Sequence, residues 1–421
     1  MTEDEAKAGI SALSQALDNY ADLLVRTGVA VQPGQELVVN APVEAYGFTR
    51  RVVRAGYAAG ARHVTVIWGD DQTARLDYEN APLEYFEHTP SWKVEQMNSL
   101  AAAGACFLSL FGEDPNALKG IDQAKPAAAR RSRNAECDVW RNGLDFGHNA
   151  WSIGGVPVPA WSRVVFPDAE SDEEAQLRLW KAILSAARAD GGDPITAWDE
   201  HNRSFARNRG KLNDGRFDRL HYTSSNGTDL TLGMTKGHVW GGGSMTTDAG
   251  VEFQPNIPTE EVFTSPDRLR AEGVVHSALP LVHNGSIVRD FWFEFHDGAV
   301  TSFGAAEGKD VLASILDTDE NARRLGECSL ISKDTPIRES GLLFYNTLFD
   351  ENASCHLALG TGFPECIEGG NDMSVDELLA HGVNHSHTHV DFMIGADDLD
   401  VTGIAADGEE VPVFRDGRWV W

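Results

Sequence analysis

The sequence has 421 residues, more than a single hydrophobic core usually serves, so two domains are expected. Its hydrophobic fraction of 42% excludes a disordered chain. The 64 acidic residues against 35 basic residues give a formal net charge of −29, which disfavours nucleic acid or an anionic membrane as a partner because both would repel the chain.

The lack of a recognisable targeting signal and the cysteine usage predict a cytoplasmic protein. The N-terminal stretch lacks the basic segment and apolar run of a secretion signal, and no later run approaches the roughly 18 apolar residues of a membrane span. The five cysteines are odd in number and form no Cys-x-x-Cys pair. This usage fits a reducing compartment and argues against a disulfide framework or a structural zinc knuckle.

The first half of the chain predicts an open α/β fold. Apolar residues recur at helical spacing over about 11–25. A strand at 37–39, a helix over 44–59 and a strand at 63–68 then form a βαβ unit. The apolar run 106–111 follows another helical segment and extends the parallel sheet.

The second half changes character after helices over 173–187 and from residue 196 towards 209. We assign residues 1–210 to an N-terminal α/β domain with a mainly parallel sheet. Residues 211–421 are assigned to an α+β C-terminal domain with a mainly antiparallel sheet, which carries the candidate metal site.

Hairpin signals support that second assignment. Two short apolar strands within 281–300 are separated by an Asn-Gly pair at 284–285 and closed by an Asp-Gly pair at 297–298. Helices are predicted over 309–315 and 320–327.

A histidine-rich segment provides the first candidate metal site. It enters an apolar run, so it is predicted to be a strand on which His385, His387, His389 and Asp391 share one face. Imidazole and carboxylate together suit zinc, cobalt, manganese or iron. The alternative is that single histidines are exposed in a loop.

Glu260 and Glu261 form a second candidate. On an extended segment their side chains point in opposite directions, so only one of them can bind a given metal. The other is then available as a general base for a metal-bound water. The alternative is a solvated acidic turn in an acidic protein.

A third candidate is the segment 348–356, in which acidic groups precede His356 after a strand predicted to end at Tyr345. Asp350 is either part of a site or the cap of a helix start.

These candidates lie in motifs that resemble the metallo-aminopeptidases typified by thermophilic aminopeptidase T, with aminopeptidase S and PepS as relatives. The resemblance covers nearly the whole chain. Its most specific motifs are residues 256–264, 323–327, 348–353, 389–391 and 416–419. Several long motifs in the right order make chance similarity implausible.

The resemblance implies two divalent metal ions, zinc, cobalt, manganese or magnesium. Carried over position by position, the ligands are Glu261, Glu327, His356, His389 and Asp391. We nominate Glu327 as the bridging carboxylate. Glu327 is predicted to lie at a helix C-terminus, where a negative charge is unfavourable. A nearby cation would explain why a carboxylate occupies this position.

The implied activity is release of N-terminal residues from peptides by a hydroxide that two metal ions activate. Glu260 is the candidate catalytic proton shuttle. The expected partners are a peptide with a free N-terminus and a second copy of the chain in a homodimer.

One position departs from the family pattern. Seven residues after His356 the family has tyrosine, whereas this sequence has Phe363, whose ring has no oxygen to bind a metal or an oxyanion. If that tyrosine stabilises transition-state charge, its loss costs about 2.7 to 4 kcal/mol, the range for removal of an oxyanion-hole donor. Tyr345 is a possible substitute.

Two other functions remain open. Histidine and carboxylate ligands also suit a mononuclear iron ring-cleaving dioxygenase, because hydroxypyridine dioxygenases have a similar C-terminal fold. Such a site needs only two histidines and one carboxylate, fewer than the five ligands available here. The second alternative is a non-catalytic descendant of the family, which Phe363 keeps open.

Overall fold

The computed structural model describes residues 1–283 and 285–421, so Asn284 of the predicted turn lies outside the described residues. The chain forms two compact units: residues 1–200 with 244–258, and residues 201–243 with 259–421. The domain boundary after residue 210 stays a prediction. Among the described residues no helix has both the length and the apolar character needed to cross a membrane.

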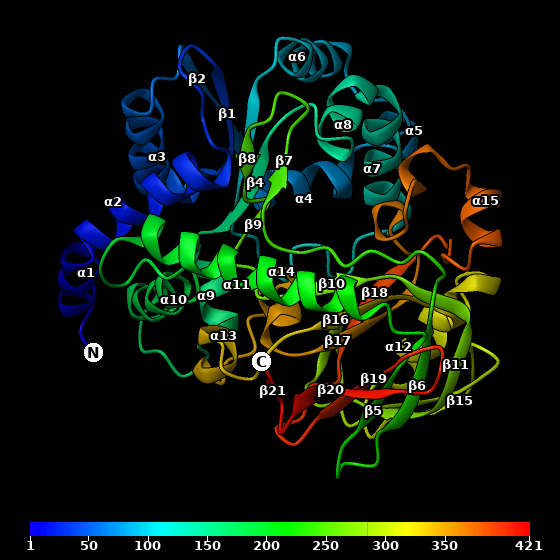
Figure 1. The fold of residues 1–421 in the computed structure, drawn as a ribbon. Coiled ribbons are helices and arrows are strands. Elements are labelled where there is room, and N and C mark those ends of the chain that lie inside the picture. The colour runs from blue at the N-terminus through cyan, green and yellow to red at the C-terminus, as the bar shows by residue number, and fades with distance from the viewer. Residues whose placement is uncertain (284) are drawn as a thin grey trace. The chain divides into compact units, whose positions relative to one another are not determined.

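The first unit contains a parallel sheet, coloured blue to green in Figure 1. Its strand order is β2-β1-β3-β4-β9, and every neighbouring pair is parallel. The strands are β1 (Glu36–Pro42), β2 (His63–Gly69), β3 (Cys106–Phe111), β4 (Trp151–Gly155) and β9 (Asn256–Ile257). Helix α3 (Tyr46–Ala58) joins β1 to β2, so the predicted βαβ unit is confirmed.

The remaining elements of this unit are mostly helices. They are α1 (Glu3–Ala12), α2 (Ser14–Leu23), η1 (Leu24–Gly28), η2 (Val43–Ala45), α4 (Asp71–Asn80), α5 (Leu83–Phe86), α6 (Ser91–Ala102), α7 (Ala124–Glu136), α8 (Asp138–Asp145), α9 (Pro159–Val165) and α10 (Asp172–Ala186). A small hairpin pairs β7 (Met245–Thr246) with β8 (Glu252–Phe253). The helix predicted over about 11–25 is observed as two helices, α1 and α2, and the first of them begins at Glu3, earlier than predicted.

The second unit is built on an eight-stranded antiparallel sheet of order β15-β14-β11-β6-β5-β19-β20-β21 (Figure 1). The strands are β5 (Arg219–Thr223), β6 (Asp229–Met234), β11 (Pro266–His276), β14 (Trp292–His296), β15 (Ala299–Gly304), β19 (Asp400–Ile404), β20 (Glu410–Arg415) and β21 (Arg418–Trp419). Helix α11 (Pro194–Gly215) runs from the first unit into the second.

A four-stranded antiparallel sheet of order β10-β16-β17-β18 completes the core of the second unit. Its strands are β10 (Val262–Thr264), β16 (Leu325–Leu330), β17 (His356–Gly360) and β18 (His389–Met393). Smaller elements are the hairpin β12 (Leu281–His283) and β13 (Ser286–Val288), and α12 (Lys309–Leu316), η3 (Glu320–Arg323), α13 (Pro336–Ser340), α14 (Thr347–Asp350), η4 (Glu351–Ala353), η5 (Pro364–Cys366), η6 (Gly370–Asp372) and α15 (Val375–Ala380). The predicted fold class, a mainly parallel sheet followed by mainly antiparallel sheets, is confirmed.

Two local predictions are wrong. The helix expected over 320–327 is only the single turn η3, and Leu325–Leu330 is a strand. Gly326 lies within the expected helix, where glycine is unfavourable, and in the strand it allows a close approach, since a Cβ there would lie 2.2 Å from the carbonyl oxygen of Thr361. The strand expected to end at Tyr345 is also absent, since that residue lies between α13 and α14 with a left-handed φ of 56°.

The four-stranded sheet has two chemically different faces. One face joins the hydrophobic core of the unit through Val262, Cys328, Leu330, Leu357, Leu359, Val390 and Phe392. Because side chains alternate along a strand, the residues between these project from the opposite face. A slip of one residue in any pairing would bury charged groups, so the apolar face fixes the register.

Truncation of Phe392 tests how much the apolar face of this sheet contributes to stability. Its ring is 1% exposed and contacts Phe291 and Phe293, with ring centroids 6.1 and 5.1 Å apart. We expect Phe392→Ala to lower the free energy of unfolding, measured by urea denaturation, by about 3 to 5 kcal/mol because it leaves a cavity. Leu269→Ala, at a side chain 50% exposed, is the control and should change it by less than about 0.5 kcal/mol. Equal effects of the two variants would contradict this packing.

Candidate metal centre

The polar face of the four-stranded sheet gathers the five candidate ligands. Glu327 lies on β16, His356 begins β17, and His389 and Asp391 lie on β18. Glu261 directly precedes β10. The sheet therefore brings together residues that are up to 130 positions apart in the chain.

The strand register explains how they meet. His356 is paired with Ser329, and Ala358 is paired with both Glu327 and Asp391. Paired residues of antiparallel strands project from the same face. The small methyl group of Ala358 leaves the space between the two carboxylates free for their side chains.

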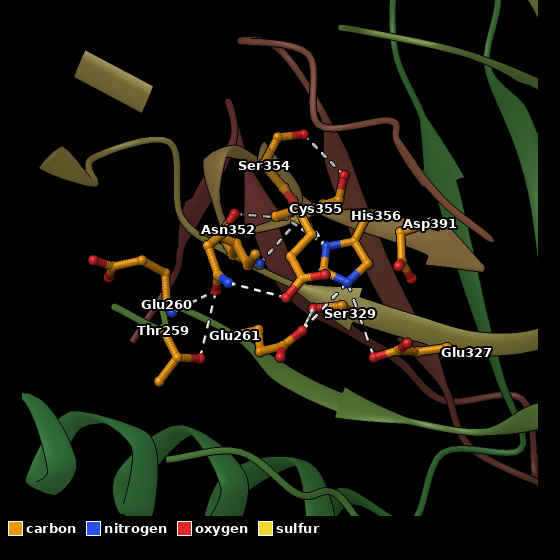
Figure 2. Close-up of polar contacts among 12 residues, drawn as sticks. Thr259, Glu260, Glu261, Glu327, Ser329, Asn352, Ser354, Cys355, His356 and Asp391 are labelled. Atoms are coloured by element: carbon orange, nitrogen blue, oxygen red, sulfur yellow. Dashed lines mark hydrogen bonds and ion pairs between the residues drawn. The ribbon is translucent and has the colours of Figure 1, made fainter. Parts of the chain in front are cut away.

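Potential ligand atoms form two groups that share one residue. Atoms of Glu261, Glu327 and His356 lie within 4.8 Å of one another, as do atoms of Glu327, His389 and Asp391. Figure 2 shows Glu327 and Asp391 beside His356. The shared position of Glu327 is what a bridging carboxylate would require.

Both imidazoles direct Nε2 into this cluster. Nε2 of His356 lies 3.3 Å from Glu261 Oε2 and 3.9 Å from Glu327 Oε1. Nε2 of His389 lies 3.2 Å from Glu327 Oε2 and 3.1 Å from Asp391 Oδ1. Each imidazole therefore contacts carboxylates of the group to which it belongs.

Backbone carbonyls hold the other nitrogen of each ring. Nδ1 of His356 lies 2.9 Å from the carbonyl oxygen of Glu351, and Nδ1 of His389 lies 2.8 Å from that of Thr361. A carbonyl accepts, so Nδ1–H donates and Nε2 is left for the cluster. Metal-binding histidines are usually oriented in this way.

The carboxylates raise the pKa of both histidines. Burial lowers the pKa of His356, but the hydrogen bond and charge of Glu261, with Glu327 and Asp391, raise it to about 10. Burial likewise lowers that of His389, and Asp391 and Glu327 raise it to about 11. The protein's own groups thus favour positive charge at both Nε2 positions.

The surroundings shift the pKa values of the carboxylates Glu327 and Asp391 in different directions. Burial raises the pKa of Glu327 to about 7, opposed by the hydrogen bond from His389. Burial also acts to raise the pKa of Asp391, but the hydrogen bond and charge of His389 outweigh it and lower that pKa. Burial and the neighbouring imidazoles therefore shift the pKa values of these two carboxylates in opposite directions.

Glu351 is a further carboxylate at this site, one that is not among the ligands predicted from the sequence. Burial raises the pKa of Glu351 well above its usual value, and the charges of Asp391, Glu261 and Glu327 raise it further. Asn352 Nδ2 donates to its Oε1 at 3.4 Å. The available signal was its position five residues before His356, in one of the motifs that carry the resemblance.

Glu260 and Glu261 point in opposite directions, as Figure 2 shows. Oε2 of Glu261 accepts a hydrogen bond from Ser329 Oγ at 3.0 Å. Oε2 of Glu260 instead lies 3.4 Å from His201 Nε2, and its backbone N–H donates to Asn352 Oδ1 at 2.7 Å. Glu260 is buried but belongs to neither group of ligand atoms.

Asp350 has a structural role. Its carboxylate accepts hydrogen bonds from the backbone N–H of Phe344 at 2.7 Å and of Asn346 at 2.9 Å. Asn346 is the N-cap of α14, so Asp350 holds the turn that begins this helix. Asp350 is itself the last residue of α14 and makes no cap hydrogen bond to the following η4, so it is not the cap of a helix start.

The prediction that His385 and His387 share the face of His389 is wrong. The strand begins only at His389, and the two earlier histidines are exposed in an irregular segment. That segment is held by other contacts: Asn321 Nδ2 donates to the His385 carbonyl, and the His387 N–H donates to Asp319. Without β-strand geometry the alternation of side chains does not apply.

Phe363 lies beside the candidate ligands. Its ring centroid is 5.1 Å from that of His389 and 5.6 Å from that of Phe263. Its backbone N–H donates to Ser265 Oγ at 2.9 Å. The ring thus limits the position of the His389 imidazole.

Proton release tests whether these imidazoles bind a cation. With pKa values of about 10 and 11, His356 and His389 are both protonated at pH 8, and a cation can bind Nε2 only after the proton leaves. We expect zinc binding to release about two imidazole protons and to weaken as the pH falls. Calorimetric titration in buffers of different ionisation enthalpy measures this number.

His389→Gln is the matched variant for this measurement, and it should release about one imidazole proton fewer. Zinc binding without proton release, or release unchanged in this variant, would contradict ligation by these imidazoles.

Comparison with known proteins agrees with the family resemblance found in the sequence. The family described as thermophilic metalloprotease (M29) matches residues 13–419. The chain is 44% identical to aminopeptidase 2 of Geobacillus stearothermophilus over 96% of this chain and 98% of that protein.

Solved structures give the same result. The wild-type AmpT structure from Thermus thermophilus matches with a TM-score of 0.90 and 40% identity, over 97% of this chain and 100% of that one. A 2,5-dihydroxypyridine dioxygenase from Pseudomonas putida KT2440 matches over 97% of both chains with a TM-score of 0.50 and 10% identity, which shows a shared fold alone. The chain therefore belongs to the thermophilic metalloprotease (M29) family.

Proposed function

We propose that the chain is a metal-dependent aminopeptidase in which Glu261, Glu327, His356, His389 and Asp391 hold two divalent cations. The observation that carries this proposal is the pair of ligand groups that share Glu327. The family and its aminopeptidase relatives support a peptide-bond hydrolase.

The charge of the cluster supports two ions. Glu261, Glu327, Glu351 and Asp391 carry four negative charges when ionised, the number that two divalent cations neutralise. A buried carboxylate without a cation or a hydrogen-bonding partner is costly. The imidazole and carboxylate donors fit zinc, cobalt or manganese, whereas magnesium would favour the oxygen donors.

Bound divalent ions would supply Lewis acidity and an activated water for hydrolysis of the peptide bond. The protein's own groups orient this site: backbone carbonyls fix the tautomer of both histidines, and Ser329 holds one oxygen of Glu261. A peptide with a free N-terminus is the proposed substrate, because its α-ammonium group suits the carboxylates that line the site.

Removing the shared carboxylate tests the proposal. We expect Glu327→Gln to lose at least one equivalent of metal, measured by elemental analysis, and to lower kcat/KM for leucine anilide by on the order of 10²-fold or more. Chelation of the parent protein should abolish cleavage, and re-addition of zinc, cobalt or manganese should restore it. Glu410→Gln, at an exposed position on β20, is the control and should leave both quantities unchanged.

Each contrary outcome has its own meaning. Cleavage that survives chelation would overturn the metal-dependent proposal. About one iron per chain, with oxygen uptake on a dihydroxylated aromatic and no anilide cleavage, would favour the dioxygenase alternative. Two bound ions without either activity would favour a non-catalytic protein in which Phe363 removed an essential hydroxyl group.

Glu260 remains our proposed proton shuttle, supported by its burial and by its position beside Glu261 in the chain. Glu351 is the competing group because it interacts electrostatically with both clusters of candidate ligands. The two carboxylates have different neighbours. Oε2 of Glu260 lies 3.4 Å from His201 Nε2, whereas Glu351 interacts with the candidate metal ligands.

Paired amide variants decide between them. If Glu260 transfers the proton, Glu260→Gln should lower kcat by roughly 10² to 10⁴-fold while the metal content stays unchanged. Glu351→Gln is the matched comparison, with the same change at the competing, half-buried carboxylate. A loss of kcat confined to Glu351→Gln would contradict the role of Glu260.

A cytoplasmic location and a homodimer are also proposed. All five cysteines are buried and unpaired, which supports a reducing compartment. The C-terminal tryptophans do not support the dimer, because Trp421 Nε1 donates to Asn208 within the second unit and Trp419 packs on Phe414. Cell fractionation and light scattering would test these two proposals.

A further inference from the structure

A small cavity of about 130 Å³ lies beside the second ligand group, entirely within the second unit. His389 and Asp391 form one part of its lining. The β12 strand and the segment 345–347 form the other walls.

The cavity has an apolar wall next to the metal cluster. Met393 follows His389 and Asp391 at alternate positions on β18, and it is paired with His356 across the sheet. Leu281 and Val282 face it from β12. The Ala278 N–H donates to the Met393 carbonyl at 2.8 Å, which ties the chain leading into β12 to this strand.

Tyr345 adds an aromatic side chain to the lining. It has a φ of 56°, a left-handed conformation that is uncommon for a bulky residue. Asp350 holds this conformation through its hydrogen bonds to the backbone on both sides of Tyr345. Backbone strain of this kind persists where the surroundings enforce it, and it is frequent at ligand sites.

The charged lining indicates which part of a peptide enters the cavity. Glu351 and Asp391 both contribute to it. Only the first residue of the substrate carries an α-ammonium group beside its side chain, and the side-chain oxygens of Glu351 and Asp391 can accept its hydrogen bonds. The part of the peptide released from the other side of the scissile bond carries no such charge before cleavage.

We propose that this cavity is the subsite for the first residue of the substrate, and that Tyr345, Leu281 and Met393 make it selective for a large apolar side chain such as leucine. This proposal rests on the proposed aminopeptidase function. Tyr345 acts here as a specificity-determining residue. Hydrophobic pockets discriminate side-chain size by about 10 to 200-fold for each methylene group.

Tyr345→Asn removes the ring without disturbing the loop, because asparagine tolerates the left-handed conformation. We expect the ratio of kcat/KM for leucine anilide to that for alanine anilide to fall about tenfold. Tyr345→Phe is the matched control, since it keeps the ring and loses only the hydroxyl group, and it should leave the ratio unchanged. Metal content should be the same in all three proteins.

Val282→Phe is a second variant that narrows the cavity at a half-buried position. It should shift the preference from leucine towards alanine. Calorimetric titration of the zinc-loaded proteins with free L-leucine and L-alanine gives a second readout that needs no catalysis. Tyr345→Asn should weaken binding of leucine about tenfold and that of alanine by less than twofold.

The results of these experiments distinguish failure of the proposed subsite from failure of the proposed aminopeptidase function. Ratios that stay within about twofold of the parent in both Tyr345→Asn and Val282→Phe, with cleavage retained, would overturn the subsite and leave the aminopeptidase intact. If no anilide is cleaved, the aminopeptidase proposal fails, and the amino-acid titrations alone decide whether the cavity binds a large apolar residue.

Discussion

The alternation of side chains in one four-stranded sheet is the constraint on which the candidate site depends. Leu357, Val390 and Phe392 must face the hydrophobic core, so the residues between them must face the other way. His356, His389 and Asp391 are those residues. The energetic preference for burying apolar groups thus determines where the charged groups lie, without any direct attraction among them.

Electrostatics then sets the chemistry of that face. Carboxylates brought together by the fold repel one another, and burial removes the water that would screen them. The hydrogen bonds and charges of Glu261, Glu327 and Asp391 raise the pKa of His356 and His389, which gives the cluster affinity for positive charge. Protons and divalent cations compete for the same Nε2 atoms, while the backbone carbonyls of Glu351 and Thr361 keep those atoms directed inward.

Much of the fold could be predicted from the sequence, because the βαβ unit shows its periodicity and the Asn-Gly and Asp-Gly pairs mark hairpins of the antiparallel part. Glu327 could not be placed in this way. Its strand is buried on both faces, so no polar and apolar alternation marks it, and only the family resemblance identified the residue. His385 and His387 show the opposite error: their alternating pattern was clear, but the strand begins after them. Glu351 was missed because its proximity to the cluster depends on tertiary contacts that no local pattern encodes.

The most direct test of the metal centre is anomalous diffraction from crystals of the zinc-loaded protein, recorded on both sides of the zinc edge. We expect two anomalous peaks, one contacted by Glu261 and His356 and the other by His389 and Asp391, with Glu327 reaching both. A single peak, or peaks that do not contact Glu327, would contradict a shared carboxylate between two ions.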